Sequence, residues 1–150
     1  MIIEINTQSS SPIYEQLRDQ IVLGIAAKKL VPNEALPSVR NLAADLGINF
    51  HTVNKAYTML CDEGYVVMDR RKGAVVAQTA AGSENEAFMS RVSRRILLAA
   101  AEAVCHDIGE SQFSDLCVEC YRNAKGDSNA NNSINSINSE NLKNSDNGGI

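Results

Sequence analysis

Side chains suited to a nucleic acid lie at two places in this 150-residue chain. Four short or basic side chains follow one face of a helical pattern, and a run of three cations ends in a glycine. The residues are His51, Thr52, Asn54 and Lys55 in the first group and Arg70, Arg71, Lys72 and Gly73 in the second. Short polar groups can bond base edges, whereas cations beside a close backbone approach suit phosphates. We therefore expect a nucleic-acid interface at these two places.

The first group is expected on the second of two short helices that meet at a glycine. Ser38 stands at an N-cap position, and apolar residues follow it at helical spacing: Val39, Leu42, Ala43 and Leu46. Gly47 supplies the positive φ that often ends a helix, and Asn49 can cap the next one. That helix places Val53, Ala56, Tyr57 and Leu60 on its apolar side and ends before Gly64. Such a pair is typical of a helix-turn-helix, whose second helix presents polar side chains to DNA.

The second group lies at the tip of a predicted β-hairpin, with strands at residues 65–68 and 74–77 and a turn at residues 69–73. A charged turn is usually only solvated, but beside a helix-turn-helix we interpret it as a phosphate contact. Upstream, Pro12 stands at the first helical position behind Ser11, and apolar residues recur every four positions to about Lys29. This first helix should cover the back of the other two.

Several short motifs stand together in one register: Leu36-Pro37-Ser38-Val39-Arg40, Leu42-Ala43, Leu46-Gly47 and Thr52-Val53, preceded by Ser11-Pro12-Ile13-Tyr14-Glu15-Gln16-Leu17. They resemble the winged helix-turn-helix of GntR-type transcriptional regulators. Ile2-Ile3-Glu4-Ile5 resembles the short first strand of the YtrA subfamily, and Asn54-Lys55-Ala56-Tyr57 resembles its recognition helix. The resemblance implies that Arg40 contacts a phosphate or base and that Ser38 holds the backbone.

Three positions depart from that family pattern. Asn41 replaces a usual acidic residue, which weakens a capping box with Ser38. Phe50 stands where many relatives have Arg or Pro, so we expect base contacts from other residues of the same helix. The predicted hairpin of residues 65–77 corresponds to the wing of that family, and it has one glycine where the family often has two. DNA contact by the tip of the wing should therefore depend more on charge. We assign DNA contact to Ser38, Arg40, Asn49, His51, Thr52, Asn54, Lys55, Arg70, Arg71, Lys72 and Gly73.

Length and charge fit one small DNA-binding domain with an accessory segment and leave no room for a catalytic domain. Lys and Arg against Asp and Glu number eight and eight in residues 1–77, five and seven in residues 78–126, and one and three in residues 127–150. The net charge of −4 is thus divided as 0, −2 and −2, so the acidic excess lies outside the DNA-binding part. No catalytic grouping or phosphate-cradling glycine loop is recognisable, and we predict no enzyme and no cofactor.

Residues 79–125 are predicted as a short helical dimerisation segment after a DNA-binding domain of residues 1–78. A helix is expected from Glu84 to about Cys105, Gly109 interrupts it, and Ser111 can cap a second helix. Their apolar stripe is Phe88, Val92, Ile96, Leu97, Ala100, Val104, Phe113 and Leu116. Two such helices either pair with a symmetry mate or fold back on the same chain. Similarity to YtrA-type members, which dimerise through such a tail, favours a homodimer on a palindromic operator.

The four cysteines are Cys61, Cys105, Cys117 and Cys120. No apolar segment approaches the ~20 residues that a membrane crossing needs, so we expect a bacterial cytoplasm, reduced thiols and no membrane partner. Cys117 and Cys120 form a CxxC, but a metal site needs a second, properly placed pair. We interpret the thiols as small buried hydrophobes and predict no metal site; metal or redox sensing is the alternative.

Residues 126–150 are predicted to be a disordered tail, because Asn recurs at every third position from Asn132 to Asn147 and apolar residues are nearly absent. For the whole chain we predict a mainly α fold with a small β-wing. Sequence and resemblance together predict a dimeric repressor of an operon, such as a transporter operon, with double-stranded DNA as its partner. A protein-interaction module with a degenerate winged helix is the alternative from another class. The sequence does not identify an effector.

Overall fold

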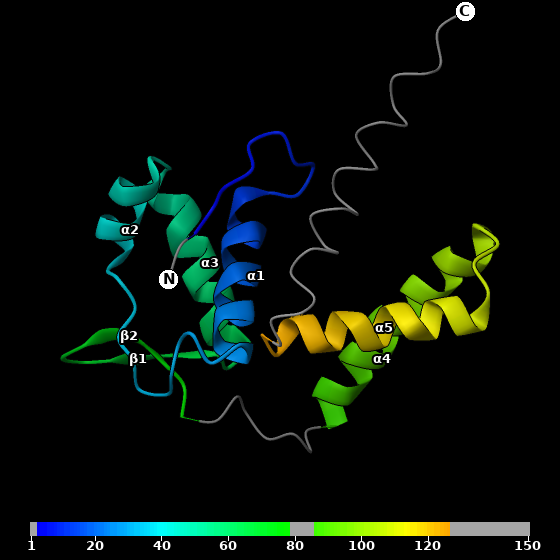
Figure 1. Cartoon of the computed structure of the whole chain (residues 1–150). Helices are drawn as coiled ribbons and strands as arrows, with labels where there is room; N and C mark the ends of the chain where they lie inside the picture. Colours follow the sequence, from blue (N-terminus) through cyan, green and yellow to red (C-terminus); the bar gives the residue numbers. More distant parts are fainter. Residues whose placement is uncertain (1–2, 79–85, 127–150) are drawn as a thin grey trace, which may run out of the picture. The chain divides into compact units, whose positions relative to one another are not determined.

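The structure is a computed structural model that describes residues 3–78 and 86–126 (Figure 1). Its elements are α1 (Ile13–Ala26), α2 (Val39–Leu46), α3 (Phe50–Asp62), β1 (Val66–Asp69), β2 (Gly73–Val76), α4 (Glu86–Cys105) and α5 (Glu110–Ala124). The chain divides into two units between Ala99 and Ala100. The predicted class, mainly α with a small antiparallel sheet, is confirmed. Of the tail predicted to be disordered, residues 126–150, only Gly126 is among the described residues, and it lies in a turn.

Helix α1 is shorter at both ends than the sequence predicted. Pro12 is its N-cap, with φ −55° and ψ 143°, and not its first helical residue. The helix ends at Ala26 instead of about Lys29, because Lys28 adopts a φ of 57° and reverses the chain. The backbone N–H groups of Lys29 and Leu30 both donate to the carbonyl of Gly24, at 2.8 and 3.0 Å, and close this turn.

The expected first strand is wrong for residues 3–5, which the structure describes without regular secondary structure. Side-chain amides of α1 take the bonds that a neighbouring strand would have taken. The Glu4 N–H donates to Gln20 Oε1 at 2.9 Å, and Gln20 Nε2 donates back to the Glu4 carbonyl. The Asn6 N–H donates in the same way to Gln16 Oε1 at 3.0 Å. The N-terminal segment is therefore tied to α1 by glutamines; residue 2 lies outside the described part.

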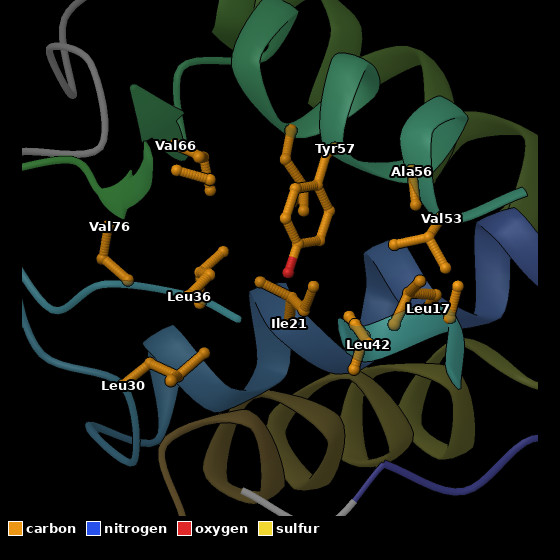
Figure 2. Close-up of a cluster of buried hydrophobic side chains, with 13 residues drawn as sticks. Leu17, Ile21, Leu30, Leu36, Leu42, Val53, Ala56, Tyr57, Val66 and Val76 are labelled. Atoms are coloured by element: carbon orange, nitrogen blue, oxygen red, sulfur yellow. The ribbon is translucent and has the colours of Figure 1, made fainter. Parts of the chain in front are cut away.

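One hydrophobic cluster holds α1, α2, α3 and the hairpin together (Figure 2). Leu17 and Ile21 of α1 meet Val53 and Leu60 of α3, and all four side chains are fully buried. Burial of such a side chain contributes about 1.5–3 kcal/mol to stability. Tyr57 crosses the middle of the cluster and donates its hydroxyl to the Pro37 carbonyl at 2.9 Å. Helix α3, the predicted recognition helix, is thereby fixed both to α1 and to the segment that leads into α2.

The hairpin pairs Val66 with Val76 through to Asp69 with Gly73, so both strands lie one residue from their predicted positions. The segment before α2 adds to the other edge of β2. The Leu36 N–H donates to the Ala74 carbonyl at 2.8 Å, and Ala35 pairs with Val75. This isolated bridge joins the hairpin to the start of the helix-turn-helix.

The two C-terminal helices are separated by a turn at residues 106–109, near the predicted break. Asp107 has a φ of 58°, and the Ile108 N–H donates to the Ala103 carbonyl at 2.9 Å. Helix α5 begins at Glu110 with Gly109 as its N-cap and no side-chain cap, so the predicted cap at Ser111 is wrong. Helix α4 is described from Glu86; the predicted start at Glu84 lies outside the described residues.

Candidate nucleic-acid interface

Local hydrogen bonds place the second helix of the pair, as the sequence predicted. Ser38 Oγ accepts from the Asn41 N–H at 3.2 Å, so Ser38 caps the N-terminus of α2. Gly47 ends α2 in the left-handed region, with a φ of 63°. Asn49 Oδ1 then accepts from the His51 N–H at 2.7 Å and starts α3. Because the capping residues Ser38 and Asn49 use their side-chain acceptors on the backbone, they act first as positioning residues.

The first turns of α3 carry the predicted contact residues. His51, Asn54 and Lys55 are exposed, while Thr52 is half-buried. On α2, Arg40 is exposed at the second helical position. All of these side chains belong to helices that pack on one core, so their backbones are held in fixed relation.

Lys55 is held by a residue that the sequence analysis did not assign to the site. Its ammonium lies 3.6 Å from the centroid of the Tyr14 ring, a cation–π contact between α3 and α1. The Tyr14 hydroxyl donates to Glu15 Oε1 at 3.1 Å, which fixes the ring in turn. The aromatic residue at the start of α1 therefore sets the position of one cation of the recognition helix.

A second contact between α1 and the end of α3 involves Arg18. Its guanidinium pairs with the Glu63 carboxylate through both Nε and Nη2, and it lies 5.6 Å from the centroid of the Tyr65 ring. Burial lowers the pKa of Arg18, but hydrogen bonds with Asp19 and Glu63 raise it above its usual value. The guanidinium thus stays charged and clamps α1 to the C-terminal end of the recognition helix.

The tip of the wing is shaped by Asp69, which the sequence analysis treated only as a turn residue. Its Oδ1 accepts from the N–H groups of Arg71 and Lys72, both at 2.8 Å. These two backbone bonds lower the pKa of Asp69. Gly73 has a φ of 76° and begins the return strand. Asp69 thus folds the turn with its carboxylate and leaves the side chains of the three tip cations, Arg70 included, exposed.

The distribution of charge at the interface favours an anionic ligand. Arg40, Lys55 and the three wing-tip cations form no salt bridge within residues 3–78 and 86–126. Figure 1 shows α2 and the tip of the hairpin on the same side of α1 in that view. Such exposed, unpaired cations on a common scaffold suit the phosphates of a duplex.

The cysteines do not assemble a site in the part of the chain that the structure describes. Cys61 is half-buried, and burial raises the pKa of its thiol. The other three thiols are exposed, contrary to the interpretation of them as buried hydrophobes. Among the described residues, no group of three His, Cys, Asp or Glu side chains is placed to hold a metal ion. None of the described helices is long and apolar enough to cross a membrane.

Comparison with known proteins agrees with this geometry. Residues 10–76 match the family of bacterial regulatory proteins described as the gntR family. The chain is 38% identical over 73 residues to the uncharacterised HTH-type transcriptional regulator YhcF of Bacillus subtilis strain 168, covering 49% of this chain and 60% of YhcF. It is 34% identical over 95 residues to the HTH-type transcriptional repressor YtrA of the same organism, covering 63% of this chain and 73% of YtrA.

A solved structure, YtrA from Sulfolobus acidocaldarius, described as a GntR-family transcription factor, superposes with a TM-score of 0.52 at 44% identity. The match covers 66% of this chain and 99% of that structure. The family and these relatives are regulators and not enzymes. The capped helix pair is followed along the chain by the hairpin, as in a winged helix-turn-helix. Together with these similarities, this shows that the chain belongs to the GntR family of bacterial regulatory proteins, in its YtrA-like subfamily.

Proposed function

We propose that this chain is a sequence-specific DNA-binding transcriptional regulator that acts as a dimeric repressor. The observation that carries the proposal is the capped start of α3, where Asn49 precedes two turns whose exposed side chains, apart from Phe50, are polar or cationic and free of acidic groups. A helix presented in this way enters the major groove with its N-terminal residues against base edges. The proposed role as a repressor is supported by similarity to YtrA of Bacillus subtilis, which is described as a transcriptional repressor.

Each predicted contact residue has a role in this proposal. His51, Thr52 and Asn54 bond base edges, because their short side chains lie on the first two turns of α3. Arg40 and Lys55 neutralise phosphates on either side of the groove. The wing-tip cations, with Gly73 allowing a close approach, bind the backbone of the neighbouring segment. Ser38 and Asn49 hold the helix starts and act through them.

The dimer is proposed from the apolar side chains of α4 and α5. The exposed fractions are 53% for Ile96, 68% for Leu97, 72% for Val104 and 39% for Leu116. The other members of the predicted stripe are half-buried: Phe88, Val92, Ala100 and Phe113. Exposed apolar side chains on these helices favour a protein interface. A second copy of the chain would cover these side chains and place two recognition helices on a palindromic operator.

Binding to duplex DNA from the region upstream of its own gene, measured across a salt series, tests the interface. We expect affinity to fall steeply with salt, with a slope near 0.9 for each phosphate neutralised. The variant with Arg70, Arg71 and Lys72 changed to alanine should have a smaller slope, as should Arg40→Ala. Arg122→Ala, which removes an exposed cation from α5, is the matched control and should keep the wild-type slope. Unchanged binding by the first two variants would refute the residue assignment, and no binding at low salt would favour a protein-interaction module.

Sedimentation of the free protein tests the dimer. Leu97→Asp should give a monomer that binds operator DNA more weakly, because a charge at the interface opposes its burial. Leu23→Asp changes an equally apolar side chain, 52% exposed on α1, and should leave the dimer intact. A wild-type chain that is monomeric at concentrations where it occupies the operator would exclude the dimer.

A further inference from the structure

Phe50 is an unusual residue for the place it occupies. It is the first residue of α3, and 43% of its surface is exposed. The other exposed side chains of α3 are His51, Asn54, Lys55, Thr58 and Asp62, all of them polar. The phenyl ring is thus a single apolar group within the polar surface that the proposed function places against DNA.

The position of the ring is defined by its neighbours. Asn49 caps the helix immediately before it, which fixes the backbone of Phe50. The ring meets the His51 imidazole edge to face, with centroids 5.6 Å apart and planes at 83°. Such pairs are a favoured arrangement of aromatic rings, so this contact restricts the orientation of the phenyl ring.

We propose that Phe50 packs against the 5-methyl group of a thymine in the major groove and so adds a thymine to the sequence that this chain recognises. The inference rests on the proposed function, since it requires α3 to lie in the groove. The thymine methyl is the apolar feature of the major-groove base edges, where the other groups are hydrogen-bond donors and acceptors. Phenylalanine has no hydrogen-bonding group, so this methyl is the feature of a base edge that it can read.

A protein partner fits the surroundings of Phe50 less well. An apolar docking site would need further exposed apolar side chains on the same helix, whereas the neighbours here are hydrogen-bonding groups and a cation. Those neighbours suit base edges and phosphates, with Phe50 covering the methyl group between them. Contact with the methyl would also remove the phenyl ring from water, which favours the bound state.

The test uses DNA that the wild-type chain selects from a randomised duplex library. Each thymine of the selected duplex is replaced singly by deoxyuracil, which removes the methyl group and keeps every hydrogen-bonding atom. We expect one replacement in each half-site to weaken binding by about fourfold, the factor that corresponds to one buried methyl group. Phe50→Ala should bind the thymine and uracil duplexes equally, and Phe50→Leu should keep part of the difference. Thr58→Ala, an exposed change on the same helix, is the matched control and should discriminate like the wild type.

Thermal unfolding of Phe50→Ala should remain close to that of the wild type, because the ring lies outside the buried core. A selected duplex in which no uracil replacement weakens wild-type binding overturns the inference and leaves the proposed function standing. A uracil effect that persists in Phe50→Ala also overturns it, since another group would then read the methyl. If the library yields no enriched duplex and the chain binds no DNA at low salt, the proposed function itself fails.

Discussion

Replacing Tyr14 by leucine removes the ring that holds the Lys55 ammonium 3.6 Å from its centroid. We expect this change to weaken DNA binding although Tyr14 need not touch DNA itself. A cation–π contact at an exposed site contributes about 0.5–1 kcal/mol. If that energy is lost from the positioning of Lys55, affinity falls about two- to fivefold for each DNA-binding head, and by the square of this factor for a dimer that engages both half-sites.

The direction of the effect follows from the geometry of the ammonium group. Lysine carries three N–H donors, and the ring face occupies only one side of them. The remaining donors can bond a phosphate while the ring still holds the charge. Tyr14 also restricts a side chain that would otherwise lose about 1.5–2 kcal/mol of rotamer entropy on binding. Holding Lys55 before DNA arrives therefore helps binding.

Equilibrium titration of wild type, Tyr14→Leu, Lys55→Gln and the double variant at one fixed salt concentration forms a double-mutant cycle. The coupling energy should be about 0.5–1 kcal/mol for each head. Tyr14→Phe keeps the ring and loses only the bond to Glu15, so it should bind nearly as wild type. Leucine keeps the apolar contact of Tyr14 with the core, and the thermal midpoint checks that the fold is intact. Tighter binding by Tyr14→Leu would mean that the ring withholds Lys55 from DNA, and additive single effects would mean that it does not position Lys55.

Three further predictions concern the scaffold. Gly47→Ala should lower the free energy of unfolding by about 1–2 kcal/mol, because an L side chain is strained at a φ of 63° although nothing crowds the new Cβ. Urea denaturation measures this loss, with Gly47→Asn as the milder control, and two variants as stable as the wild type would contradict the prediction. Glu63→Ala should lower the free energy of unfolding by about 1–3 kcal/mol, because Nε and Nη2 of the largely buried Arg18 guanidinium lose their acceptor and only the bond to Asp19 remains. A loss below about 0.5 kcal/mol in the same assay would mean that this ion pair does not stabilise the fold. The pKa of Asp69 is lowered from 3.8, so its contribution to the wing tip is complete above that pH and is lost as the pH falls through the lowered value. Amide exchange at the tip should report this loss in wild type and not in Asp69→Asn, and equal pH dependence of the two would refute the role of the carboxylate.

The helix pair could be predicted from the sequence because its signals are local. Ser38, Gly47 and Asn49 each act on backbone groups within four residues along the chain, and the structure places all three as expected. The hairpin was predicted nearly as well, since a change of period and a glycine turn are also local features.

The features that the sequence did not predict depend on residues distant in the chain. Gln20 satisfies Glu4 across 16 positions and replaces the expected strand. Tyr14 reaches Lys55 only because α1 packs on α3, and no periodicity of either helix contains that contact. Asp69 is a different case, because an aspartate at the start of a turn commonly bonds the backbone two residues on, so its contact with Arg71 follows from a local signal. The dimer and the DNA contacts stay predictions, since they concern partners outside the chain.

The hydrogen bond from Tyr57 to Pro37 gives the DNA-binding domain a natural optical reporter. The chain contains four tyrosines and no tryptophan, and burial raises the pKa of Tyr57 from 10.0 to about 12. A phenolate has no proton to donate to the Pro37 carbonyl, so ionisation of this ring and loss of the link between α3 and the start of α2 are one event. The stabilising contribution is complete below pH 10 and disappears as the pH rises towards 12. An alkaline titration followed by ultraviolet absorbance would therefore record the opening of the core without any label.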